Sequence, residues 1–208
     1  MFNDFKEEFK HILNQGLIKN NPLFVLALSL TPVLAVSDTL EKAFALGFTV
    51  LVIMIIVNLF ISLFKTKISK EMLNVFIILL LAFLVSVAEM IMQVRNLGLY
   101  QDLGIYLPLT AVSGLVLQRA RTYANEHNAL HSLVDGFAYG VGFLGALVIV
   151  TIIRVIASTG SITLLNIPMR LFDPVYSFSL ANTAFGALLI VGLLLGIFKT
   201  FQQRGDSK

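Results

Sequence analysis

The run AFALGFTVLVIMIIVNLFISLF, residues 43–64, decides the fold class of this chain. It contains no charged side chain and is long enough for a helix to cross a bilayer core, which takes about 20 apolar residues. Over all 208 residues, 57% are hydrophobic, 13% are charged and the mean hydropathy is +0.88. A soluble domain has about 25% charged residues and cannot bury this much apolar surface. The sequence therefore predicts an all-α integral membrane protein.

Five more apolar segments, bounded by charged or turn residues, flank this run. The six predicted spans are residues 23–40, 43–64, 71–93, 102–118, 132–156 and 176–199. Ahead of them, Phe5, Phe9 and Ile12 recur at helical spacing opposite charged residues, which favours an amphipathic helix on the membrane surface over an ordinary solvated helix. No cleavable signal peptide is expected, since this segment is polar. We divide the chain into a cytoplasmic lead-in (1–20), a membrane domain (21–200) and a polar tail (201–208).

The distribution of positive charge predicts the orientation. Placing the N-terminus inside puts most of the 15 Lys and Arg residues on inner segments, as cytoplasmic loops require. Only Lys42, Arg95, Arg154 and Arg170 then fall on outer segments. We expect both termini to be cytoplasmic. The same bias explains the net charge of +3, so no nucleic-acid partner is expected.

Short motifs recur in the two halves of the chain. Residues 32–37 and 108–113 both read P-x-x-A-V-S, and residues 44–47 and 137–140 both read F-A-x-G, in the same order. Because three crossings turn a chain over, such halves form an inverted repeat, as in many transport proteins. We expect a 3+3 inverted repeat with halves of about 21–98 and 99–200, although short matches in an apolar sequence also arise by chance.

The repeated prolines predict interrupted helices in spans one and four. Proline removes a backbone hydrogen bond and clashes with the preceding turn, so Pro32 and Pro108 are expected to break short helices. Paired, interrupted spans in the two halves point to a site near the membrane midplane. The alternative is a pair of kinked structural helices without a site. We favour the site, in a cavity between spans one and four.

Few polar side chains lie inside the predicted spans. Asn58 and Glu89 are candidate pathway residues, since intramembrane polar groups are costly. Their alternatives are structural: Asn58 bonding a neighbouring helix, and Glu89 reaching water or pairing with Arg95. Asp135 follows Ser132 at capping spacing and is interpreted as a helix start. No soluble-enzyme motif is present, so the chain is expected to be non-catalytic.

Several segments together carry a family resemblance. They are residues 21–23, 30–36, 98–109, 119–120 and 134–137, of which the run GLYQDLGIYLPL at 98–109 is the most specific. Over about residues 20–200 the chain resembles the RnfE/NqrD family, membrane subunits of the Rnf ferredoxin:NAD and Nqr quinone-reducing ion pumps. The resemblance implies six helices, an inverted repeat and an RnfA/NqrE-like partner subunit of opposite orientation.

The resemblance also implies an iron centre, which this sequence does not match. Family pairs hold iron midway through the membrane with a cysteine from each broken helix, and the corresponding positions here are Thr31 and Gly114. The chain contains no cysteine, which also excludes disulfides and thiolate metal sites. A hydroxyl and a glycine cannot replace two thiolates on iron. We therefore expect no cofactor on this chain, with flavin and iron–sulfur centres implied in partner subunits.

Two functional hypotheses follow. The first is a membrane subunit of an Rnf/Nqr-like complex in the bacterial cytoplasmic (inner) membrane, which couples electron transfer to translocation of Na+ or H+. The second is a small inverted-repeat transporter or carrier subunit with no redox role.

Overall fold

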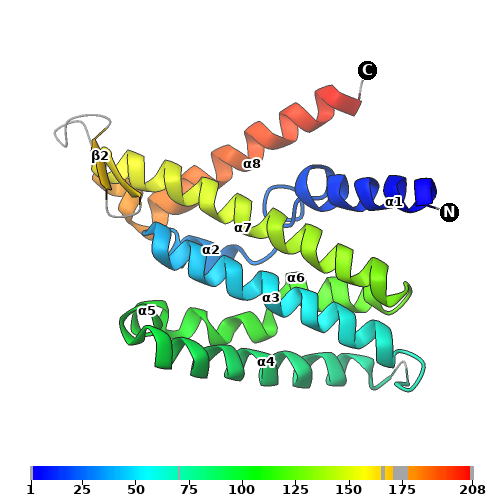
Figure 1. Ribbon diagram of the computed structural model, residues 1–208. Helices are drawn as coiled ribbons and strands as arrows, with labels where there is room; N and C mark the ends of the chain where they lie inside the picture. Colours follow the sequence, from blue (N-terminus) through cyan, green and yellow to red (C-terminus); the bar gives the residue numbers. More distant parts are fainter. Residues whose placement is uncertain (1, 70, 165–166, 171–177, 207–208) are drawn as a thin grey trace.

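The computed structural model describes residues 2–69, 71–164, 167–170 and 178–206 and is helical apart from one short hairpin (Figure 1). The elements of the first half are α1 (Phe2–Asn14), η1 (Gln15–Lys19), α2 (Leu30–Val36), α3 (Leu40–Phe64) and α4 (Leu73–Arg95). Those of the second half are α5 (Leu97–Leu103), η2 (Gly104–Tyr106), η3 (Pro108–Val112), α6 (Gly114–Arg119), η4 (Ala120–Ala124), α7 (Ala129–Thr159), β1 (Ser161–Leu164), β2 (Ile167–Arg170), η6 (Ser179–Asn182) and α8 (Ala184–Asp206).

Four helical segments are long and apolar enough to cross a membrane, so the chain is a multi-pass membrane protein. They are Leu40–Phe64, Leu73–Arg95, Leu97–Ala124 and Ala129–Thr159, which correspond to predicted spans two to five. Predicted span one contains only the short helix α2. Predicted span six contains the apolar helix Ala184–Thr200, and its first two residues, 176–177, lie outside the described residues. Residue 70 and the last two residues of the predicted tail, 207–208, also lie outside them.

Helices α3 and α7 form the centre of the bundle, and glycines bring their backbones together. A Cβ added at Gly140 would lie 2.9 Å from the Leu51 Cα, and one at Gly47 would lie 3.3 Å from the Leu144 Cα. Gly140 therefore faces Leu51, four residues after Gly47, and Gly47 faces Leu144, four residues after Gly140. Small residues at such positions allow close packing of transmembrane helices. The glycines of the two F-A-x-G motifs thus lie at points of close contact between α3 and α7.

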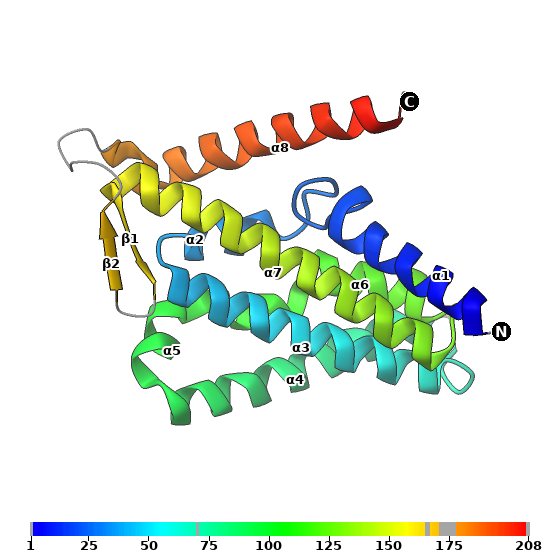
Figure 2. The ribbon, with the colours of Figure 1, turned by 45° about the horizontal axis from the view of Figure 1, so that its top comes forward.

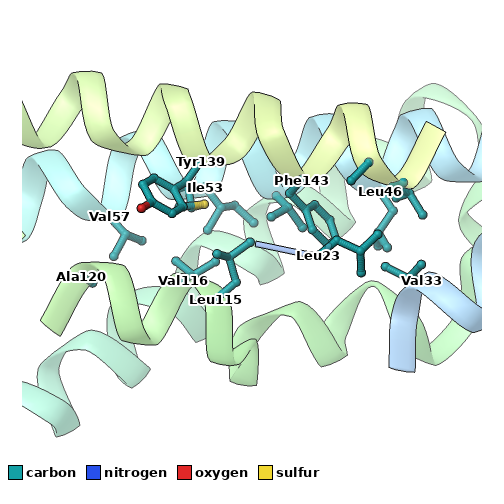
Figure 3. Close-up of a cluster of buried hydrophobic side chains, with 14 of the residues drawn as sticks. Leu23, Val33, Leu46, Ile53, Val57, Leu115, Val116, Ala120, Tyr139 and Phe143 are labelled. Carbon is teal, nitrogen blue, oxygen red and sulfur yellow. The ribbon is translucent and has the colours of Figure 1, made fainter. Parts of the chain in front are cut away.

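The buried core continues from this contact to the interrupted segments. Figure 3 shows the side chains of α3 and α7 meeting those of α2, α6 and η4, with Leu23 between them. Leu23, Leu46 and Phe143 are fully buried. This core fixes the short helices against the two long ones, although the short helices form few backbone hydrogen bonds of their own.

Both Pro-containing spans are interrupted, but the two P-x-x-A-V-S runs differ in structure. Pro32 lies in the first turn of α2, whereas Pro108 begins the 3-10 helix η3, ahead of the break at Ser113. Ala27 and Ser29 precede α2 with φ angles of 51° and 60°, a left-handed conformation that costs a residue other than glycine about 1–2 kcal/mol. Asn21 stabilises this turn by accepting hydrogen bonds from the Leu23 and Phe24 amides.

Arg154, near the C-terminal end of α7, holds α2 in place. The residue is 4% exposed, and its guanidinium donates to the Leu34 carbonyl and the Ser37 hydroxyl, both at the C-terminal end of α2, at 2.8 and 2.7 Å. It also donates to the Ala181 and Asn182 carbonyls of η6, just before α8. A cation at a helix C-terminus is favourable, since the exposed carbonyls carry partial negative charge. Arg154 thus joins three elements distant in sequence.

Replacing Arg154 with methionine is expected to lower the free energy of unfolding by about 3 kcal/mol, since four acceptors, in two buried and two partly buried hydrogen bonds, lose a charged donor. The measurement is a denaturant titration in detergent, followed by circular dichroism because the chain has no tryptophan. Arg121→Met, at an exposed position in η4, is the matched control. Equal losses in the two variants would contradict the role of Arg154.

Candidate functional site

A buried ion pair joins α6 to α7 at the level of α3. Arg119 donates to both carboxylate oxygens of Asp135, from Nε to Oδ2 at 3.2 Å and from Nη2 to Oδ1. The Asp135 side chain is fully buried and that of Arg119 is 16% exposed. Asn58 of α3 donates from Nδ2 to Asp135 Oδ2 at 3.1 Å. The carboxylate therefore has donors from two neighbouring segments.

Aromatic rings hold the Arg119 guanidinium in its position. The Arg119 Cζ lies 3.9 Å from the centroid of the Tyr139 ring and 4.9 Å from that of Tyr123. The Tyr123 ring in turn stacks on the His127 ring at 3.9 Å. A cation near an aromatic face is attracted to the π electrons, and this attraction strengthens where water is excluded. Arg119 is thus fixed by the rings as well as by Asp135.

A polar cavity of about 810 Å³ leads to this pair from the end of the molecule that carries α1. Its walls include the carboxylates of Glu7, Glu8, Glu126 and Asp135, together with Arg119 and histidines from three segments. Helix α1 runs alongside the first part of α7 (Figure 2), and Glu8 bonds His131 with an oxygen–nitrogen distance of 2.9 Å. The N-terminal helix therefore forms one wall of the cavity.

Two buried oxygens next to the pair lack a protein partner among the described residues. They are Asn58 Oδ1 and Ser132 Oγ, both on fully buried side chains. Ser132 and Asp135 lie on one face of α7, three residues apart. A buried acceptor without a donor costs about 1–3 kcal/mol. The site thus has oxygen atoms that a water molecule or a cation can bind.

The fold brings only some of the polar residues singled out from the sequence to this site. Asn58 bonds the neighbouring helix α7 through Asp135. The interpretation of Asp135 as a helix start was wrong, because α7 begins at Ala129 and Asp135 is buried inside it. Glu89 lies far along α4, half-buried, and forms no ion pair with Arg95 in the described part of the chain.

The two interrupted spans meet at the starts of their short helices. Ser29 precedes α2, Ser113 precedes α6, and the hydroxyl oxygens of these two residues are 2.7 Å apart. Thr31 and Gly114, in the first turns of the two helices, are both exposed. These positions are thus neighbours across the break and open to the surface of this chain.

Known membrane proteins resemble this chain over most of its length. The family described as "Rnf-Nqr subunit, membrane protein" matches residues 9–198. This chain belongs to the Rnf-Nqr membrane subunit family. The E subunit of the proton-translocating ferredoxin:NAD(+) oxidoreductase complex of Clostridium ljungdahlii is 35% identical over 193 residues, which cover 93% of this chain and 89% of that protein.

Two other relatives of this Rnf-Nqr chain are named as the E subunit of an ion-translocating oxidoreductase complex. The protein of Haemophilus influenzae (strain PittGG) is 36% identical over 160 residues, covering 77% of this chain and 68% of that protein. The protein of Vibrio vulnificus is 33% identical over 202 residues, covering 91% of this chain and 87% of that protein. The resemblance at residues 98–109 and 134–137 therefore reflects membership of the family.

The iron centre implied for Rnf-Nqr subunits does not fit the donor atoms of this chain. Thr31 has a hydroxyl, Gly114 has no side chain, and the sequence contains no cysteine. Iron–sulfur clusters are held by thiolates, with histidine as the usual replacement. Within the described residues, no group of three or more His, Cys, Asp or Glu is placed to hold a metal ion. We derive no step through iron bound at these two positions.

Sequence reasoning missed Arg119, Tyr139 and the role of Asp135. Asp135 lies inside predicted span five, where an ionisable residue is itself a signal of function, but the capping pattern with Ser132 obscured that signal. Arg119 was assigned to a loop, because it follows span four directly. Only the fold shows that the two residues form a pair.

Proposed function

We propose that this chain is the E subunit of an Rnf-type complex that couples electron transfer from ferredoxin to NAD+ with ion translocation. The observation that carries the proposal is an ion pair between the fully buried Asp135 and the largely buried Arg119 at the end of a polar cavity, in a chain whose relatives are named as subunits of such complexes. Ionisable residues inside a membrane usually belong to ion or proton pathways.

The cluster suggests how this subunit contributes to ion movement. The carboxylates of the cavity attract cations, and Asp135 is the carboxylate farthest from the surface. Asn58 Oδ1 and Ser132 Oγ add two neutral oxygens beside it. A Na+ ion or a proton that reaches Asp135 displaces the Arg119 guanidinium, which the Tyr139 and Tyr123 rings then hold. The ion pathway is thus proposed at α7, not between spans one and four.

We further propose the complete six-span topology, with both termini cytoplasmic, the lead-in and tail outside the membrane domain, and a location in the bacterial inner membrane. The 3+3 inverted repeat is supported by the reciprocal contacts of Gly47 with Leu144 and of Gly140 with Leu51. Both contacts come from the sequence F-A-x-G-x-x-x-L, at residues 44–51 and 137–144. A pseudo-two-fold axis between α3 and α7 produces this reciprocity.

The partners of this subunit are proposed from its exposed breaks. An RnfA/NqrE-like subunit is expected to cover Thr31 and Gly114, since both are exposed at the break between Pro32 and Pro108. Flavin and iron–sulfur centres belong to other subunits in this proposal, and this chain is non-catalytic. Asn58 contributes to the ion pathway, whereas Glu89 lies on another helix, away from the cavity.

The test uses the whole complex, purified through a tag on this chain and reconstituted into vesicles. Reduced ferredoxin and NAD+ are expected to drive ion uptake, and Asp135→Asn to abolish uptake without changing the iron and flavin content of the complex. Uptake that requires no electron donor would instead favour the transporter hypothesis. If a complex purified through a tag on another subunit lost iron when this chain alone was deleted, the proposed lack of an iron centre on this chain would be contradicted.

A further inference from the structure

An apolar groove of about 430 Å³ lies between α3 and α4, at the end of the molecule opposite to the polar cavity. Small, half-buried residues form its floor: Ala45 and Thr49 of α3 and Ala88 of α4. Large exposed side chains form its walls. Phe44 and Phe48, stacked at 6.2 Å, are 57% and 52% exposed, and Ile91 opposite is 58% exposed.

The floor of the groove has hydrocarbon character along its whole length. The Thr49 hydroxyl donates to the Ala45 carbonyl at 2.8 Å, so it is engaged within α3. From Phe44 to Ile56 the groove follows α3 for about 18 Å at the helical rise of 1.5 Å per residue. One leaflet of a bilayer contains about 15 Å of hydrocarbon. The groove therefore matches a chain from a single leaflet.

A single cation lies at one end of this groove. Arg95, the last residue of α4, lines the groove and is exposed, and within the described residues it has no ion-pair partner. The adjacent Asn96 uses its Oδ1 to accept from the Leu99 amide. An apolar channel that ends in an arginine is complementary to a molecule with a long tail and an anionic head, and guanidinium groups bind phosphate oxygens well.

We propose that this groove binds one membrane phospholipid, with an acyl chain on the α3–α4 floor and the phosphodiester at Arg95. A transmembrane helix of another subunit is the competing occupant. Small residues such as Ala45, Thr49 and Ala88 also occur at helix interfaces in membranes. Here, however, they lie behind a rim of large exposed side chains, Phe44, Phe48 and Ile91, which keeps the backbone of another helix away from the floor. A volume of about 430 Å³ over a length of about 18 Å is a mean cross-section of about 24 Å², far less than a helix about 10 Å across occupies, so a single hydrocarbon chain fits better.

Native mass spectrometry of the full chain, titrated with phosphatidylglycerol in detergent, tests the proposal. We expect one tightly retained lipid, about fivefold weaker binding in Arg95→Gln, and loss of the retained lipid in Ala88→Phe, which fills the floor. Diacylglycerol, which lacks the phosphate, should bind wild type and Arg95→Gln equally. The controls are Arg121→Gln and Leu79→Phe, two exposed positions away from the groove. Unchanged retention in both groove variants would overturn the proposal.

A second measurement in the assembled complex separates lipid from protein. Because the chain has no cysteine, Ala88→Cys introduces a unique attachment point for a photo-cross-linker. Cross-links to phospholipid are expected. Cross-links to a neighbouring subunit instead would show that the groove is a helix–helix interface and would overturn the lipid assignment.

Discussion

Gly140→Val is expected to lower the free energy of unfolding by about 3 kcal/mol. A Cβ at this position would lie 2.9 Å from the Cα of Leu51, which belongs to the backbone of α3 and cannot rotate away. The two central helices must then separate, and overpacking of this kind costs about 1–3 kcal/mol, occasionally more. The measurement is a denaturant titration in detergent, followed by circular dichroism at a helical wavelength.

Gly145→Val is the matched control for this prediction. It lies on the same helix, has the same change in helix propensity, and a Cβ there has no atom within 4 Å. Gly47→Val should give an intermediate loss, since its nearest contact is a side-chain atom of Leu144 at 3.2 Å. If Gly140→Val and Gly145→Val lost the same stability, the close approach of α3 and α7 would not be the reason that position 140 is glycine.

Hydropathy alone located the long helices, because an uncharged run such as 43–64 has only one stable environment. The same method could not locate α2 or the start of α8. The turn before α2 depends on Asn21 bonding the carbonyl of Gly142, 121 residues away in sequence, and on the core around Leu23. No local propensity encodes such contacts. Proline marked the spans that break, but not the residues at which they break.

The candidate site was less predictable than the fold. A bond from Asn58 to a neighbouring helix was one of the two roles predicted for it, but its partner Asp135 was misread, because capping patterns and buried ion pairs use the same residue types. The F-A-x-G repeat was visible in the sequence, whereas its meaning as a reciprocal Gly–Leu contact required the antiparallel packing of α3 on α7. Pairing across helices is a property of the tertiary structure.

Arg119→Gln is expected to destabilise the chain by about 4 kcal/mol, more than any surface ion-pair substitution. It leaves the Asp135 carboxylate fully buried with neutral amide donors such as Asn58 and without a cation, and removing one partner of a buried pair typically costs about 3–5 kcal/mol. Lys42→Gln is the control, since Lys42 and Asp38 form a partly exposed pair within one helix end, worth less than about 1 kcal/mol. The readout is again the unfolding titration.

The double variant Arg119→Gln/Asp135→Asn separates stability from ion movement. Neutral amides at both positions remove the uncompensated charge, so this variant should recover most of the stability lost in Arg119→Gln. It should nevertheless fail to support ferredoxin-driven ion uptake in the reconstituted complex, because the cavity then ends without a carboxylate. A double variant that is stable and also pumps at the wild-type rate would show that the buried pair serves the fold alone, and that ions cross the membrane by another path.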